Sequence, residues 1–242
     1  MEQKARYQYL QYSRLVTNIS NHVGKGGIFL KTILILGAAG QISTYLTADL
    51  LKETDYKLKL FARNASKRIK VTDSSRETLI DGDFKDKRTL NAALDGVDAV
   101  YLNEMRDLDA VKNIVTQMDA TGVKKLVVAT VLGVEDEVKG KFGQWNNAMI
   151  ASSIERRKKT AAVLKKSDLD YTQLRLAWLF NDDNNTAYEV TQSGEPFGGT
   201  EVSRQAVAKL IVKILEDDSG KYARKSLGVN EPNTKFDKPS FY

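Results

Sequence analysis

Several residue types that carry chemistry are absent or scarce in this chain of 242 residues. There is no cysteine, which excludes disulfides, thiolate metal sites and thiol nucleophiles. The single histidine, His22, precedes the region with a folded pattern, so histidine triads and histidine-based zinc sites are also excluded. No apolar run reaches the roughly 18 residues of a membrane-spanning helix, and the start lacks a secretory signal. We therefore expect a cytoplasmic protein without a metal site and without a membrane partner.

Basic residues outnumber acidic ones, and the formal net charge is +6. Residues 1–29 contain four basic residues and one acidic residue, so they carry half of this excess. The remaining charge is ordinary for a soluble domain. One dense basic run, from Arg156 to Lys159, is typical of the solvated face of a helix. The charge therefore does not predict a nucleic-acid partner.

The first 29 residues differ from the rest of the chain because they are polar and aromatic and end in a glycine-rich stretch. Lys25-Gly26-Gly27 is compatible with a purine-rich ribosome-binding site, and Leu30 with an alternative start codon. We predict that residues 1–29 are a non-native or disordered leader and that residues 30–242 form the domain. The alternative is a genuine N-terminal helix, because Tyr9, Tyr12 and Ile19 recur at helical spacing.

Strand-like and helix-like segments alternate from residue 32 onward. Short apolar runs predict strands at 32–36, 58–62, 78–80, 97–102, 126–131, 171–176 and 226–229. Helical spacing predicts helices at 41–54, around 90–94, at 107–121, at 150–167 and after the capping residue Ser203. Residues 132–148 are expected to form a loop, and residues 181–202 a lid over the site. The alternation predicts an α/β fold: a single domain with a Rossmann-like, doubly wound parallel sheet.

A glycine motif, Gly37-Ala38-Ala39-Gly40-Gln41-Ile42-Ser43, lies between the first predicted strand and the first predicted helix. Gly37 allows a tight turn, and Gly40 lets the backbone approach a pyrophosphate. The helix that follows offers free N–H groups and a positive dipole end to that anion. Ser43 replaces the third glycine of the usual spacing and is small enough for helix–strand packing. This placement predicts a dinucleotide-binding turn.

The residues after the second strand indicate which dinucleotide is bound. NAD-binding proteins commonly carry an acidic residue there, which bonds the adenosine ribose. This chain has Arg63 instead, with Lys67 and Arg68 close behind it. An arginine can form a bidentate pair with a 2′-phosphate, which predicts NADP(H) as the cofactor. Asp83 and Phe84 follow the third strand, where the adenine is expected.

These segments, together with Gly96 to Val100, Gly122 to Thr130 and Leu169 to Arg175, resemble the atypical short-chain dehydrogenases of the NmrA-like, NAD(P)H-binding group. The resemblance covers residues 31 to about 230. In its C-terminal part, the sequence is similar to a bacterial subgroup of these proteins. It implies a Rossmann fold with NADP(H) along the strand ends. It does not imply one substrate, because the group includes flavin and quinone reductases, sugar-nucleotide relatives and non-catalytic redox sensors.

The chain departs from the group in the residues of acid–base catalysis. Enzymes of this kind carry a Tyr-x-x-x-Lys pair and a serine or threonine at the end of the fifth strand. Thr130 matches the hydroxyl position and is the one catalytic candidate, but Ser153 and Arg157 stand where the tyrosine and lysine are expected. None of the tyrosines is followed by lysine four residues later. The usual general acid is therefore missing.

Two functions remain open. One is an oxidoreductase that passes hydride from NADPH to a flavin- or quinone-like acceptor, which is a small molecule that takes its proton from water. The other is a non-catalytic NADP(H)-binding sensor or regulatory protein, and a homo-oligomer is compatible with both. The predicted cofactor-binding residues are Gly37, Ala39, Gly40, Gln41, Ile42, Arg63, Asp83, Phe84, Asn103 and Thr130.

Overall fold

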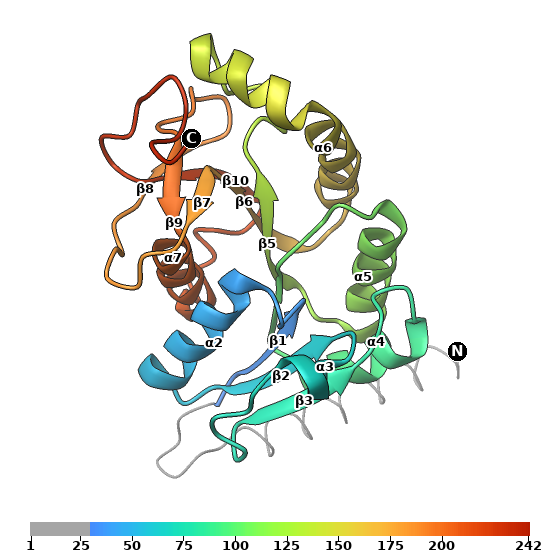
Figure 1. Cartoon of the computed structure of the whole chain (residues 1–242). Helices are drawn as coiled ribbons and strands as arrows, with labels where there is room; N and C mark the ends of the chain where they lie inside the picture. The colour runs from blue at the N-terminus through green and yellow to red at the C-terminus, as the bar shows by residue number, and fades with distance from the viewer. Residues whose placement is uncertain (1–29) are drawn as a thin grey trace.

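A central sheet of eight strands organises the computed structural model, which describes residues 30–242 (Figure 1). In spatial order the strands are β3 (Glu77–Asp81), β2 (Lys57–Ala62), β1 (Thr32–Leu36), β4 (Ala99–Leu102), β5 (Lys125–Val131), β6 (Asp170–Leu176), β10 (Lys225–Asn230) and β8 (Glu189–Thr191). All neighbours pair in parallel except β8, which runs antiparallel to β10. The strand order reverses between β1 and β4, which is the arrangement of a doubly wound Rossmann-like sheet. The predicted fold class is confirmed. The predictions about residues 1–29 lie outside the described residues.

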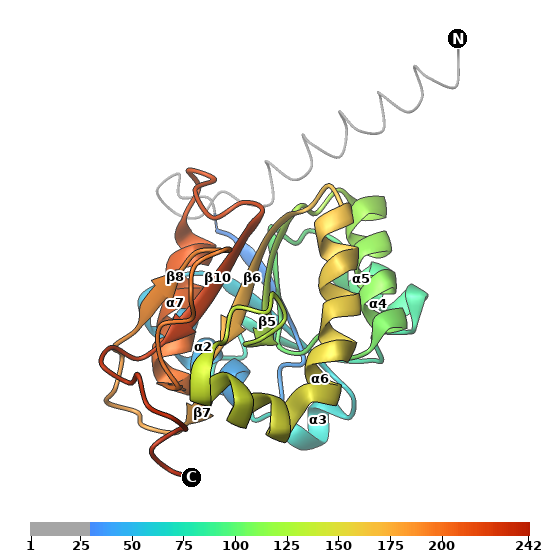
Figure 2. The same ribbon diagram turned by 90° about the horizontal axis from the view of Figure 1, so that it is seen from above.

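Helices cover both faces of the sheet (Figure 2). They are α2 (Gln41–Glu53), α3 (Ala65–Arg68), α4 (Lys87–Leu94), α5 (Leu108–Thr121), α6 (Gly140–Lys166) and α7 (Arg204–Glu216). One face carries α2 and α7, and the other carries α4, α5 and α6. Alternate residues of β1 therefore enter different cores: Ile33 and Ile35 pack with α2 and α7, and Leu34 with the opposite layer. This double burial explains why the strand is a continuous apolar run.

Side-chain caps fix where several helices begin. Ser203 Oγ accepts a hydrogen bond of 2.9 Å from the backbone N–H of Ala206 at the start of α7. Asp107 caps α5 in the same way, through the N–H groups of its first turn. At the other end of α5, Gly122 adopts a φ of 78°, a conformation that glycine adopts without strain. The cap predicted at Ser203 is thus confirmed.

Helix α6 begins ten residues earlier than its sequence pattern predicts, at Gly140 instead of Ile150. The prediction of a loop over the whole of 132–148 is wrong for its second half. Ile150 has a non-helical φ of −136°, so two helical pieces meet there at a kink. The apolar periodicity changes at Ile150, so the sequence pattern did not predict the helical piece that precedes it. That piece is held by aromatic contacts from distant residues, since the Trp145 ring packs on Trp178 and Tyr242.

The predicted lid, residues 181–202, contributes to both sheets of the structure. Within it, β8 pairs with β10 at the edge of the main sheet. At its C-terminal end, β9 (Glu201–Ser203) pairs with β7 (Trp178–Phe180) in a separate two-stranded sheet. These strands have three residues each, which is too short for a recognisable alternation in the sequence. Within residues 30–242, no helix combines the length and the apolar character needed to cross a membrane.

Candidate functional site

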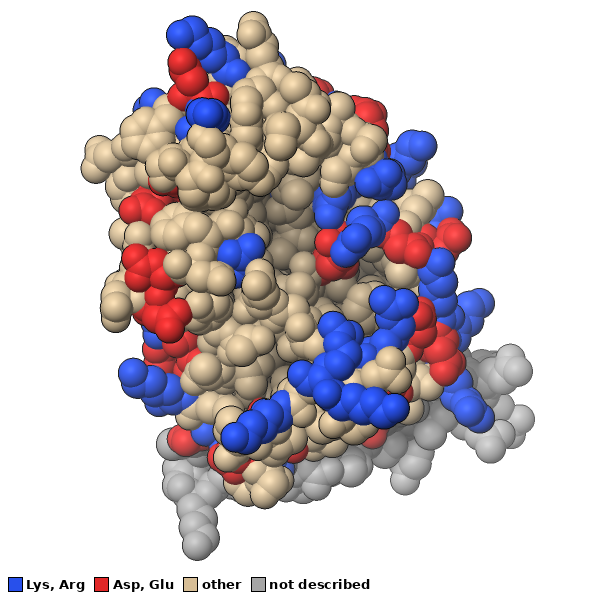
Figure 3. Space-filling view, in the orientation of Figure 1, with Lys and Arg blue, Asp and Glu red and all other residues tan. Residues whose placement is uncertain are grey.

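A cavity of about 570 Å³ lies at the carboxyl ends of β1, β2, β3 and β4. Its volume is in the range of small-molecule and cofactor pockets. In the space-filling view, Lys and Arg side chains gather along the border of a hollow at this side of the molecule (Figure 3). The cavity is lined by Gly37, Ala39, Gly40, Ala62, Arg63, Arg68, Gly82, Asp83, Phe84, Lys85, Asn103, Glu104, Arg106, Asp107 and Ala110.

The glycine turn has the geometry that an anion requires. Gly37 has a φ of 84°, which strains any other residue. A Cβ atom on Gly40 would collide with the side chain of Asn103, so a larger residue there would displace Asn103. Ser43 is fully buried and donates a hydrogen bond of 3.0 Å to the carbonyl of Gly37, which holds the turn against α2. No side chain caps α2, so its first N–H groups are available to a ligand.

Asn103 is fixed beside this turn by a buried tyrosine. The Tyr101 hydroxyl donates to Asn103 Oδ1 at 3.1 Å. Burial raises the pKa of Tyr101 far above its usual value, so the hydroxyl stays protonated and keeps this donor role. Because Oδ1 is occupied, the amide nitrogen of Asn103 is the atom that lies against Gly40. The side chain therefore presents a donor at the glycine turn.

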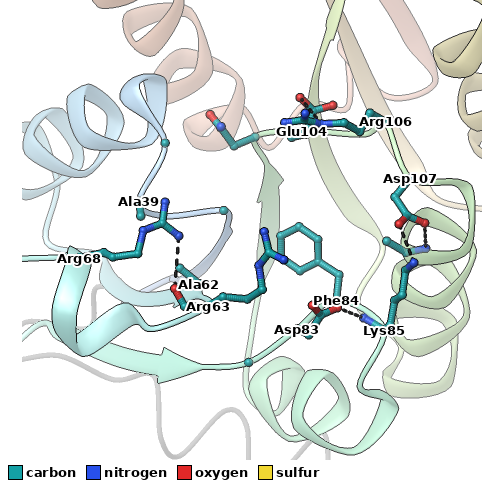
Figure 4. Close-up of a pocket in the computed structure, with 15 residues that line it drawn as sticks. Ala39, Ala62, Arg63, Arg68, Asp83, Phe84, Lys85, Glu104, Arg106 and Asp107 are labelled. Carbon is teal, nitrogen blue, oxygen red and sulfur yellow. Dashed lines mark hydrogen bonds and ion pairs between the residues drawn. The ribbon is translucent and has the colours of Figure 1, made fainter. Parts of the chain in front are cut away.

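Two arginines border the cavity after β2. Arg68, at the end of α3, donates to the carbonyl of Arg63 at 3.2 Å, and both side chains line the cavity (Figure 4). Asp81 accepts a hydrogen bond of 2.6 Å from the N–H of Ala65 and thereby holds the start of α3. Of the two assisting cations considered from the sequence, the structure brings Arg68 to the cavity and not Lys67.

The adjacent part of this border comes from the loop after β3 (Figure 4). Phe84 stacks on Phe61 with ring centroids 5.7 Å apart, and its carbonyl accepts a 2.6 Å bond from Asn113 Nδ2. Asp83 lines the cavity beside it, and Lys85 forms a 2.7 Å ion pair with Asp107. The Phe84 ring is thus held as part of the cavity wall.

Sequence reasoning did not identify Glu104, the residue directly after Asn103. Glu104 lines the cavity, and its two carboxylate oxygens lie 2.8 and 3.0 Å from Arg157 Nη2. Arg157 also bonds the Ser153 hydroxyl one helical turn away. Burial lowers the pKa of Arg157, and the charge of Glu104 opposes this shift. The only available signal in the sequence was position, since Glu104 follows the end of a strand in the same way as Asn103.

Three of the predicted site residues do not line the cavity. The side chain of Ile42 is buried under α2 and that of Gln41 is exposed, so each could reach a ligand only through its backbone N–H. Thr130 is buried in β5, and among the described residues its Oγ1 has no hydrogen-bond partner. The other seven, Gly37, Ala39, Gly40, Arg63, Asp83, Phe84 and Asn103, are brought together around one cavity.

Residues 37–218, which are most of the chain, match the model of a family described as NAD(P)H-binding. The chain belongs to this family. The match includes the glycine turn, both arginines and α6. The cavity fits the family's cofactor, because Gly37 and Gly40 line it and the described residues leave the first N–H groups of α2 without a side-chain cap.

Solved structures and a curated protein add detail to this family assignment. A short-chain dehydrogenase/reductase of Veillonella parvula DSM 2008, in complex with NADP, is 36% identical with a TM-score of 0.84, covering 87% of this chain and 99% of that one. A Rossmann-fold NAD(P)-binding family protein of Shigella flexneri is 32% identical with a TM-score of 0.74, covering 88% of this chain and 100% of that one. NAD(P)H azoreductase of Xenophilus azovorans is 31% identical over 116 residues, which are 47% of this chain and 40% of that protein. The chain thus spans less than half the length of this curated relative.

Proposed function

We propose that this member of the NAD(P)H-binding oxidoreductase family is an NADPH-dependent reductase with a flavin- or quinone-like acceptor. The family assignment supports the cofactor class. The partial match to an NAD(P)H azoreductase supports a reductase that acts on a conjugated, electron-poor acceptor rather than on an alcohol.

The choice of NADPH over NADH is based on the residues after β2. Arg63 and Arg68 border the cavity there, and their guanidinium groups suit a phosphate through charge-assisted hydrogen bonds. The acidic residue that would favour NADH is missing from this position. The nearest strand-end carboxylate, Asp81, is engaged by the N–H of Ala65 and by Ser66.

The observation that supports the proposed reaction is that Arg157 is bonded to both Ser153 and Glu104. Ser153 and Arg157 bond each other, and Arg157 also holds Glu104. An arginine keeps its proton at neutral pH, and an unassisted serine or threonine hydroxyl is a poor acid. Among residues 30–242, this region therefore contains no tyrosine–lysine pair that could protonate a carbonyl. A flavin or quinone needs no such donor, because it takes its proton from water.

In this proposal the protein contributes binding and orientation. The glycine turn and the start of α2 receive the pyrophosphate, while Arg63 and Arg68 hold the 2′-phosphate. Phe84 supplies an apolar wall for the adenine, and the Asn103 amide donates at the turn. When bound, the nicotinamide supplies the hydride. Holding donor and acceptor in contact converts a bimolecular reaction into an effectively unimolecular one, which is the main source of acceleration available here.

The test is oxidation of NADPH by the purified protein with a panel of flavins, quinones and azo compounds, with NADH in parallel. We expect turnover with at least one acceptor, a preference for NADPH, and no NADP⁺-dependent oxidation of secondary alcohols or sugar nucleotides. Tight NADPH binding without turnover on any acceptor would contradict the reductase and favour the sensor instead.

A further inference from the structure

A carboxylate is unexpected in a cavity for an anionic cofactor, because like charges repel each other, and its presence therefore needs a physical explanation. Glu104 is such a group: it lines the cavity, and its side chain is 30% exposed. On the protein side it is held by Arg157, whose side chain is only 10% exposed. Arg106 lies on its other side, with Nε 3.4 Å from Glu104 Oε2. The two arginines offset the charge of the carboxylate and restrict its orientation, while part of it still faces the cavity.

The strand order places Glu104 relative to the cofactor. Along the edge of the sheet, Arg63 follows β2, the glycine turn follows β1, and Asn103 and Glu104 follow β4. If Arg63 holds the adenosine 2′-phosphate and the turn receives the pyrophosphate, the chain of the cofactor proceeds from β2 across β1 to β4. The second ribose, which follows the pyrophosphate, then lies at Glu104. Figure 4 shows Glu104 and Arg106 on the far side of the cavity from Arg63 and Arg68.

The chemistry of this ribose matches a carboxylate. An ionised carboxylate only accepts hydrogen bonds and has about four acceptor positions on its two oxygens. Arg157 Nη2 bridges both oxygens from one direction, so further acceptor positions remain on the cavity side. Two neighbouring ribose hydroxyls are matched donors, as for the acidic residue that bonds the adenosine ribose in NAD-binding proteins.

We propose that Glu104 accepts hydrogen bonds from the hydroxyls of the nicotinamide ribose, and that Arg157 is a positioning residue that fixes the Glu104 carboxylate. The proposal relies on the cofactor orientation given under Proposed function, but not on turnover. It gives the Ser153–Arg157 pair a role in cofactor placement, although these residues do not act as an acid.

Three ligands of increasing length test this assignment by calorimetry: 2′-phospho-ADP, 2′-phospho-ADP-ribose and NADPH. The first ends at the pyrophosphate, the second adds the second ribose, and the third adds the nicotinamide. Glu104→Gln should weaken the two ligands that carry the second ribose by about tenfold or more, as expected for a lost charge-assisted bond, and leave 2′-phospho-ADP unchanged. A loss confined to NADPH would assign Glu104 to the carboxamide instead. An equal loss for all three ligands, or none, would show that Glu104 only neutralises Arg157. Each of these three results overturns the proposal.

Two further variants protect the test from misfolding. Glu104→Gln leaves Arg157 buried without its counter-charge, so Glu104→Gln/Arg157→Met removes both charges together. The double variant should show the same ligand pattern, and recovery of wild-type affinity in it would contradict the proposal. Glu155→Gln, an exposed residue of α6 outside the cavity, is the matched control and should bind all three ligands like wild type. Arg63→Ala should weaken all three ligands, so a wrong cofactor orientation is recognised separately.

Discussion

Arg63 and Arg175 both lie at the carboxyl edge of the central sheet, one directly after β2 and the other near the end of β6. Arg175 is completely buried, with Nη1 2.9 Å from Glu137 and Nη2 3.2 Å from the carbonyl of Gln192. Arg63 is exposed, and within the described part of the chain its guanidinium makes no ion pair or hydrogen bond. One arginine is paired inside the protein, whereas the other keeps its donors for a ligand.

The surroundings explain this difference. Glu137 also accepts hydrogen bonds of 2.9 Å from the N–H groups of Gly133 and Glu135, so Arg175 stabilises the loop between β5 and α6. Arg63 instead has Lys67 and Arg68 close behind it in the sequence, and within residues 30–242 no carboxylate forms an ion pair with it. Uncompensated cations at a cavity favour an anionic ligand, while a buried cation requires protein partners. The same residue type at the same edge therefore has a structural role at β6 and a proposed binding role at β2.

The largest effect, a loss in the free energy of unfolding, is expected for Arg175→Met. The substitution leaves Glu137, whose side chain is 2% exposed, as a buried charge without its partner. Breaking a buried pair in this way costs about 3–5 kcal/mol. Urea unfolding should show this loss, and Arg63→Met serves as the matched control, with a change within about 0.5 kcal/mol. A loss below about 1 kcal/mol for Arg175→Met would show that water or rearrangement satisfies Glu137.

A smaller effect, on binding instead of folding, is expected for Arg63→Met. Loss of a charge-assisted contact to the 2′-phosphate should weaken NADPH by about 1.5–3 kcal/mol, or roughly one to two orders of magnitude. NADH, which lacks this phosphate, should bind almost as before. Calorimetric titration of both cofactors measures the difference, with Lys67→Met as the control because Lys67 does not line the cavity. Equal affinities of the wild type for NADPH and NADH would refute the assignment of Arg63.

The smallest effect is expected at Thr130, whose hydroxyl neither has a partner within residues 30–242 nor lines the cavity. Because its Oγ1 is buried without a partner among the described residues, Thr130→Val removes an unsatisfied polar atom at nearly constant shape. Stability should change by no more than about 1 kcal/mol, and turnover with the best acceptor by less than about tenfold. Removing a true general acid typically costs about 10²–10⁴-fold. Abolished turnover with intact NADPH binding would reveal a proton relay through Thr130.

Seven strands of the Rossmann-like sheet, all except β8, were predictable because each is a short apolar run, and the glycine turn because its spacing is tied to a strand and a helix. The start of α6 was not, because the contact of Trp145 with Trp178 and Tyr242 joins residues far apart in the chain. The partners of Arg175 could not be predicted from local pattern either. They are Glu135 and Glu137, which lie some 40 residues earlier in the chain and fold back onto it.

Local order in the chain was sufficient for the fold class, the dinucleotide turn and the cationic position after β2, because backbone conformation and burial of a strand act over a few neighbouring residues. The partners of charged side chains required the folded molecule. Glu104 and Arg157 are 53 positions apart, and their contact exists only because the loop after β4 lies against α6 in the folded molecule. A charge is stabilised or left free by what surrounds it in space, and this depends on the packing of distant segments.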